Sequence, residues 1–300
     1  MKQINIRGVN HFYEYVQCEC GDKSADDRPV LIFIHGWLLS HHFWSPLIKE
    51  LQTQYSCLSY DLKGFGRSKL PDNYASLNQE SDCNLFSLDD YSNDLQVLLE
   101  TLEIKKAWLI GHSLGGSVAL WGADKCQEIV EGVVCVNAGG GIYLQDEFNR
   151  FRTAGENLVK FRPSWLVNVP FLDRIFARMM VKVPLSAYWG KQRIIDFVSA
   201  DEIAAVGSLL ESTTEEQVHY LPQIVARLSQ PVHFIAGKQD FVMEPQYVKH
   251  LASFHSLFQD LQKNVYEIDN CGHFAMLEQM EEVANRITNI LTPEYQLSID

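Results

Sequence analysis

The sequence lacks an excess of positive charge. It has 25 lysines and arginines against 38 aspartates and glutamates, so its formal net charge at pH 7 is −13. Binding of DNA or RNA depends mainly on lysine and arginine contacts to phosphate groups, which a strongly acidic chain is poorly suited to make. We therefore predict that the protein has no nucleic-acid partner.

Long hydrophobic runs are also missing. Residues 1–10 alternate apolar and polar side chains and contain no apolar stretch as long as that of a secretory signal. Residues 107–123 form a long stretch without charged side chains. Its serines and glycines are typical of a buried turn and not of a membrane span. We expect neither a signal peptide nor a spanning helix.

Cysteine is scarce and scattered. The chain has seven, an odd number at irregular spacings: Cys18, Cys20, Cys57, Cys83, Cys126, Cys135 and Cys271. This pattern favours reduced thiols and a cytoplasmic setting over a disulfide framework. Cys18 and Cys20 lack a second pair of ligands, so a zinc site is not indicated. The sequence implies no other metal and no organic cofactor.

Short apolar, β-branched runs alternate with helical patterns along the chain. The predicted strands are residues 3–7, 12–17, 30–34, 57–60, 107–110, 133–137, 232–236 and 265–268. The predicted helices are residues 43–52, 88–102, 113–125, 245–253 and 280–291. This order predicts an α/β fold, with a mostly parallel sheet of eight strands covered by helices on both faces. The first two strands should form an antiparallel hairpin, because few residues separate them.

Two segments interrupt this alternation. Residues 71–87 are polar and rich in turn formers, which predicts either a disordered insertion or a flap over the site. Residues 144–221 contain helical patterns and no strand-like run. The sequence therefore predicts a core of residues 1–143 and 222–300 with an inserted helical cap of residues 144–221.

One serine lies in a pattern typical of a nucleophile. The sequence Gly111-His112-Ser113-Leu114-Gly115 joins a predicted strand to a predicted helix. A serine that attacks a carbonyl group must project from a strained turn. Glycines two residues before and after it leave room for the strand and the helix. Ser113 is therefore the candidate nucleophile.

A serine nucleophile needs a base and an acid that orients the base. His273 follows the last predicted strand, and Asp240 follows the strand before it. His273 could instead be a capping or core histidine, and Asp240 a turn aspartate. Their places at strand ends favour the catalytic interpretation for both.

Other residues compete for the role of the acid. Asn137 ends the preceding strand, but an amide cannot stabilise an imidazolium by charge. Asp269 is too near His273 in the sequence to orient it easily. Asp61 is better explained as a structural partner of the turn at residues 64–68. Asp240 therefore remains the candidate acid.

An oxyanion hole requires two backbone donors. One is the N–H of Leu114, directly after the nucleophile. The other is the N–H of Trp37, since His35-Gly36 places a glycine bend after the strand of residues 30–34. The alternative is that His35-Gly36 is only a turn.

These motifs resemble the α/β-hydrolase fold family across nearly the whole chain. They are His35-Gly36, Asp61 with residues 64–68, residues 111–116, Gly237 with Asp240, and Gly272-His273. The resemblance implies the α/β-hydrolase fold, with Ser113 as nucleophile, His273 as base and Asp240 as acid. Dehalogenases and epoxide hydrolases of this family carry an aspartate at the elbow, so the serine indicates the serine hydrolase branch. Trp37 departs from the small residue or proline that often follows His-Gly, which indicates a bulky apolar wall.

The predicted cap combines apolar and basic side chains. Its apolar residues include Phe148, Phe151, Leu158, Phe161, Trp165, Phe171, Phe176, Met179 and Met180, among the basic residues Arg150, Arg152, Lys160, Arg162, Arg174, Arg178 and Lys182. They could simply pack the cap onto the core while the basic residues face water. They could also form an apolar surface with a basic rim, suited to a lipidic substrate or to an anionic membrane face. The predicted substrate contacts are His35, Trp37, Leu38, His112, Phe148, Phe151, Phe161, Phe171, Phe176, Met179 and Met180.

The start of the cap suggests a substrate class. Residues 137–141 through 160–163 are similar to the cap entrance of cyanobacterial and plastid α/β-hydrolases, a group that includes chlorophyll dephytylases. This similarity implies the phytyl ester of chlorophyll as substrate and a thylakoid location. The sequence predicts a serine carboxylic-ester hydrolase for an apolar ester. The alternatives are an acyltransferase, a C–C bond hydrolase, or a receptor with an inactive triad.

Overall fold

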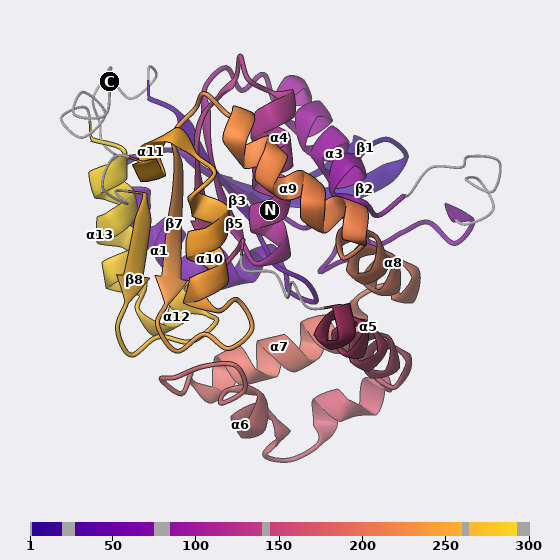
Figure 1. Ribbon diagram of the computed structural model, residues 1–300. Helices are drawn as coiled ribbons and strands as arrows, with labels where there is room; N and C mark the ends of the chain where they lie inside the picture. The colour runs from indigo at the N-terminus through magenta and orange to yellow at the C-terminus, as the bar shows by residue number, and fades with distance from the viewer. Residues whose placement is uncertain (1, 20–27, 75–84, 140–144, 260–263, 293–300) are drawn as a thin grey trace.

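The computed structural model describes residues 2–19, 28–74, 85–139, 145–259 and 264–292 (Figure 1). Within these residues, eight strands form one sheet in the order β1-β2-β4-β3-β5-β6-β7-β8. The antiparallel pairs are β1 with β2 and β2 with β4, and every other neighbouring pair is parallel. The predicted α/β class and the predicted N-terminal hairpin are therefore confirmed.

The strands lie close to their predicted positions. They are β1 Lys2–Ile6, β2 Val9–Val16, β3 Val30–Ile34, β4 Cys57–Tyr60, β5 Ala107–His112, β6 Val130–Val136, β7 Val232–Gly237 and β8 Val265–Ile268. Strands β5 and β7 have no exposed residue. Such continuous burial is typical of central parallel strands, because helices cover both of their faces.

Helices cover the two faces of the sheet. On one face lie α3 (Leu88–Thr101), α4 (Leu114–Lys125), α9 (Glu215–Arg227) and α10 (Pro245–Ala252). On the other lie η2 (His41–Trp44), α1 (Ser45–Leu51), α12 (Ala275–Glu278) and α13 (Met280–Ile290). The short helix α11 (Ser256–Gln259) precedes β8. Two separate hydrophobic clusters result, one on each face.

The segment between β6 and β7 is helical, as predicted. It contains α5 (Gln145–Lys160), η3 (Ser164–Asn168), α6 (Leu172–Phe176), α7 (Ala187–Ser199), α8 (Glu202–Ser212) and α9. Helices α5, α6 and α7 lie beyond the edge of the core in Figure 1. Helix α9 continues past residue 221 and packs on α4 and α10 of the core. The predicted end of the cap therefore falls inside a helix, because Pro222, a residue that usually ends a helix, lies within α9.

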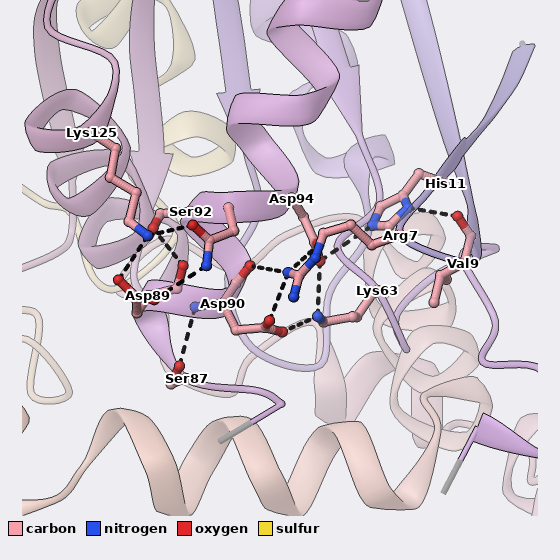
Figure 2. A network of polar contacts seen from close by, with 12 residues as sticks. Arg7, Val9, His11, Lys63, Ser87, Asp89, Asp90, Ser92, Asp94 and Lys125 are labelled. Atoms are coloured by element: carbon pink, nitrogen blue, oxygen red, sulfur yellow. Dashed lines mark hydrogen bonds and ion pairs between the residues drawn. The ribbon is translucent and has the colours of Figure 1, made fainter. Parts of the chain in front are cut away.

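Partly buried ion pairs connect the N-terminal hairpin to α3 (Figure 2). Lys63 pairs with Asp90 and lies 2.9 Å from Asp94, and Arg7 lies 2.7 Å from Asp90 and 3.0 Å from Asp94. His11 stands 3.9 Å from Asp94. Breaking one partner of such a network would leave a buried charge uncompensated. The network therefore holds the hairpin, α3 and the loop after β4 in one arrangement.

Most of the predicted flap lies at residues 75–84, outside the described residues, while its last residue, Ser87, caps α3.

Cys57, Cys126, Cys135 and Cys271 are free and buried. Cys18, however, is disulfide-bonded, so the expectation of reduced thiols is wrong there, because spacing alone does not determine pairing.

In the part of the chain that the structure describes, no helix is long and apolar enough to cross a membrane.

Candidate active site

Ser113 stands at a strained turn between β5, which ends at His112, and α4, which begins at Leu114. Its φ of 52° and ψ of −120° are unfavourable for a residue with a side chain. A Cβ at Gly111 would stand 2.2 Å from the carbonyl oxygen of Gly115. The structure thus confirms the predicted strand, sharp turn and helix, with the serine at the apex.

His273 and Asp240 form a hydrogen bond, although 33 residues separate them. The Nδ1 atom of His273 donates to Oδ2 of Asp240 over 2.8 Å. The N–H groups of Val242 and Met243 donate to the other carboxylate oxygen, at 2.8 and 3.0 Å. Burial alone would raise the pKa of Asp240, but His273 and these two N–H groups outweigh it and lower the pKa. The aspartate therefore stays ionised and leaves Nε2 as the basic atom of the ring.

Asn137 contributes to this arrangement in a way that the sequence did not predict. Its Nδ2 atom donates to Oδ2 of Asp240 and to the carbonyl oxygen of Gly272, each over 3.0 Å. Its Oδ1 atom accepts a hydrogen bond from the N–H of Ala275 over 3.0 Å. One amide thus connects the loop that carries the acid to the loop that carries His273. The sequence signal available for this role was the position of Asn137 at the end of β6, beside β7.

The two predicted oxyanion donors lie beside the elbow. A Cβ at Gly36 would stand 2.7 Å from His112 Nδ1 and 3.1 Å from Ser113 Cβ, so the His35-Gly36 bend packs directly on the elbow. Leu114 is the first residue of α4, where N–H groups lack an intrahelical acceptor. Among the turn and loop hydrogen bonds of the described residues, neither Leu114 nor Trp37 donates its N–H.

His35 has a structural position, and the prediction that it contacts substrate is wrong. Its Nε2 accepts a hydrogen bond from the N–H of Leu62 over 2.9 Å, and its Nδ1 donates to the carbonyl oxygen of Gly36 over 2.8 Å. Burial lowers its pKa to about 4, so the ring is neutral. The ring is fully buried and does not line the pocket. It fixes the bend instead.

The predicted structural role of Asp61 is confirmed. Its Oδ2 atom accepts a hydrogen bond from the N–H of Arg67 over 2.8 Å, inside the predicted turn. Its Oδ1 atom accepts from both the N–H and Nδ1 of His41, at 2.8 and 2.7 Å. With both carboxylate oxygens engaged away from the elbow, Asp61 cannot replace Asp240 beside His273.

A pocket of about 280 Å³ opens above Ser113, between the core and the cap. Both Ser113 and His273 line it, and so do the predicted contacts Trp37, Leu38, His112, Phe176, Met179 and Met180. Sequence reasoning missed several mostly apolar lining residues, among them Leu158, Arg193, Phe197, Leu209, Leu221, Met243 and Phe274. The helical spacing of the lining residues that belong to the cap could have indicated that they share one face of a helix. It could not indicate whether that face turns to the core.

Two predicted substrate contacts point elsewhere. Phe161 is 76% exposed and Phe171 is 67% exposed, and neither lines the pocket. Phe161 lies directly after α5, and Phe171 precedes α6, on the outer part of the cap. Phe148 and Phe151 belong to α5, but their side chains lie outside the described part of the chain. The prediction is therefore wrong for Phe161 and Phe171 and stays a prediction for the other two.

The cap is joined to the loop that carries His273. The carbonyl oxygen of Met180 accepts a hydrogen bond from the N–H of His273 over 2.8 Å. The Glu278 carboxylate accepts from the N–H groups of Lys182 and Val183 in the cap and of Gly272 and Phe274 in the core. His112 also supports this loop, since its Nε2 donates to the carbonyl oxygen of His273 over 2.7 Å. The cap and the histidine therefore hold one another in place.

Asp196 in α7 gives a second contact between cap and core. Its carboxyl group should make the free energy of unfolding depend on pH. Ser40 Oγ donates to Asp196 Oδ2 over 2.7 Å. Burial raises the pKa of Asp196 to about 7, from an ordinary value of 3.8. Between about pH 4 and pH 7 the folded state holds a proton that the unfolded state releases. The free energy of unfolding should therefore fall as the pH rises through that window, by at most about 1.4 kcal/mol per pH unit.

Urea unfolding at pH 5 and pH 8 measures this effect. The natural protein should lose more stability between the two pH values than the Asp196→Asn variant, since an amide does not titrate. Every other titrating group is common to both proteins and cancels in the comparison. An equal loss in the two proteins would mean that Asp196 is ionised throughout.

Comparison with known proteins identifies the family of the chain. The sequence model of the alpha/beta hydrolase fold matches residues 29–279. The chain belongs to this family. It is 31% identical to Epoxide hydrolase 1 of Caenorhabditis elegans over 117 residues, which cover 38% of this chain and 26% of that protein.

Two further proteins match over most of their length. The chain is 27% identical to 2-succinyl-6-hydroxy-2,4-cyclohexadiene-1-carboxylate synthase of Salmonella typhimurium, over 88% of this chain and 94% of that one. A thermophilic esterase of Thermogutta terrifontis, solved with malate bound, has a similar fold, with a TM-score of 0.71 at 19% identity. That match covers 100% of this chain and 99% of the esterase. Taken together, the comparisons support a hydrolase.

Proposed function

We propose that the protein is a serine carboxylic-ester hydrolase whose substrate has an apolar body. The observation that carries this proposal is the hydrogen bond of His273 to Asp240 beside a serine on a strained elbow, in one largely apolar pocket. A serine with a base, an orienting acid and backbone donors suits attack on a carbonyl group.

The reaction would proceed through an acyl-enzyme. Oγ of Ser113 attacks the ester carbonyl carbon while its proton passes to Nε2 of His273. The N–H groups of Trp37 and Leu114 stabilise the resulting oxyanion. The bond to the alcohol then breaks, and His273 gives the proton to the leaving oxygen. Water next loses a proton to His273 and attacks the acyl carbon, so that Ser113 recovers its proton and the acid is released.

The alternative functions differ from ester hydrolysis in the residue at the elbow, in the reaction products or in the substrate. One relative is named an epoxide hydrolase, but this chain carries a serine where the family resemblance assigns an aspartate to epoxide hydrolases. Acyl transfer and C–C bond cleavage would use the same triad, and product analysis separates them from ester hydrolysis. The phytyl ester of chlorophyll stays a prediction, tested by release of chlorophyllide from chlorophyll. Docking of the cap on an anionic membrane also stays a prediction.

Covalent labelling tests the proposed nucleophile directly. A fluorophosphonate probe should label the folded natural protein once, at Ser113, because only an activated serine displaces fluoride from phosphorus at an appreciable rate. The Ser113→Ala variant and the heat-denatured natural protein should not be labelled. Peptide mass spectrometry locates the adduct. Absence of labelling in the folded natural protein would instead support a receptor with an inactive triad.

A further inference from the structure

A buried arginine lies in the wall of the same pocket. Arg193 belongs to α7 in the cap and is only 6% exposed. It lines the pocket together with Ser113 and His273. A cation in an otherwise largely apolar pocket is unusual, because removing a charged group from water costs several kcal/mol unless a counter-charge compensates.

The groups that Arg193 contacts directly are electrically neutral. Its Nη1 atom donates to the carbonyl oxygen of Phe176 and, over 2.8 Å, to that of Met179. Its Nη2 atom lies 4.0 Å from the thioether sulfur of Met180, a weak acceptor. The guanidinium carbon lies 4.4 Å from the centre of the Phe274 ring. These contacts hold the side chain firmly in place but do not neutralise its charge.

The neighbouring carboxylates are engaged elsewhere. Glu278 is near enough to act on Arg193 electrostatically, yet its oxygens accept the four backbone N–H groups described above. Asp196 bonds to Ser40 and Gln192. No ion pair of Arg193 is present among the described residues. Burial lowers the pKa of Arg193 to about 10, although Glu278 opposes the shift, so the guanidinium is charged at neutral pH.

One aromatic side chain, Phe274, contacts Arg193 and also lies beside His273. Arg193 packs on Phe274, the residue after His273, and the rings of His273 and Phe274 are 5.6 Å apart. A group held by Arg193 would therefore lie in the pocket that Ser113 and His273 also line.

We propose that Arg193 binds a carboxylate group of the substrate, so that the preferred ester has an apolar body and a free carboxylate. This inference rests on the proposed ester hydrolysis and specifies its substrate class. The carboxylate would accept hydrogen bonds from the guanidinium edge that the Phe176 and Met179 carbonyl oxygens leave available. A planar guanidinium suits such recognition better than the point charge of a lysine.

Paired esters test the preference. Monomethyl esters of straight-chain dicarboxylic acids, from succinate to suberate, are compared with methyl esters of the monocarboxylic acids of equal length. For at least one length, the natural protein should show a kcat/KM ratio, charged over neutral, of about tenfold or more, since a hydrogen bond to a charged group contributes about 1.5–3 kcal/mol. The ratio should fall to about one or below in Arg193→Met, and Arg193→Lys should retain part of it.

A matched variant controls for general electrostatics. Arg178, also in the cap, is exposed and does not line the pocket, so Arg178→Met removes an equal charge and should leave the ratio unchanged. Because both esters are measured on one protein sample, a poorly folded fraction cancels in the ratio. A ratio near one at every length in the natural protein, or an unchanged ratio in Arg193→Met, would overturn the inference.

A binding measurement separates this inference from the proposed function. Titration calorimetry of Ser113→Ala with dicarboxylates of the same lengths needs no turnover. Binding should weaken at least tenfold when Arg193→Met is added to that variant. If no ester is hydrolysed but this difference is present, the proposed function fails while the carboxylate site stands. If neutral esters are hydrolysed and the difference is absent, the carboxylate site fails alone.

Discussion

Replacing Ser113 by alanine should lower kcat for a neutral p-nitrophenyl ester by about 10⁶-fold, because the residues of a triad act as one unit. His273→Ala should cost a similar factor. The double variant should be no slower than either single variant, since removing one member already abolishes nucleophilic attack. Steady-state rates, with active sites of the natural protein titrated, measure these factors.

The stability of the variants is the control for this experiment. Ser113 has an unfavourable backbone conformation, and its side chain lies in the pocket, so alanine should not weaken the fold. Urea unfolding of Ser113→Ala should therefore match that of the natural protein. A variant that is fully folded and loses less than about tenfold in kcat would contradict the assignment of Ser113 as nucleophile.

The fold was predictable because its signals are local. The central strands are continuous apolar runs, and three of the eight, including β3, begin and end at the predicted residues. The elbow was predictable for the same reason. The glycines around Ser113 are required because a side chain there would collide with the adjoining strand or helix. Helix ends were less predictable: α9 runs on past residue 221, although Pro222 directly after it is a residue that usually ends a helix.

The site was predictable where chemistry requires a particular residue type at a strand end. Asp240 and His273 meet because β7 and β8 are parallel neighbours, so their carboxyl ends lie at the same edge of the sheet. The cap was less predictable, because an amphipathic helix does not state which partner its apolar face meets. Phe161 and Phe171 face solvent for this reason, whereas Arg193 is buried although arginine side chains are mostly exposed in folded proteins.

A methyl group at Gly115 should be far more harmful than one at Gly122 in the same helix. A Cβ at Gly115 would stand 2.3 and 2.5 Å from the carbonyl oxygens of Ile34 and His35, which belong to the end of β3 and the oxyanion bend. A Cβ at Gly122 would meet Leu95 Cδ2 at 2.6 Å, the far end of a flexible side chain. The first contact can be relieved only by moving backbone, and the second by turning a side chain.

Gly115→Ala should therefore lower the free energy of unfolding by several kcal/mol, or shift the elbow and lower kcat by about 10²-fold, since a misplacement of about 1 Å has that effect. Gly122→Ala should stay within about 1 kcal/mol of the natural protein, because the better helix propensity of alanine offsets the crowding. Urea unfolding and p-nitrophenyl ester turnover of both variants test this difference. Equal stability and equal turnover of the two variants would contradict this prediction. They would mean that β3 and α4 can move apart without loss of stability, and that activity does not need the close packing of the oxyanion bend on the elbow.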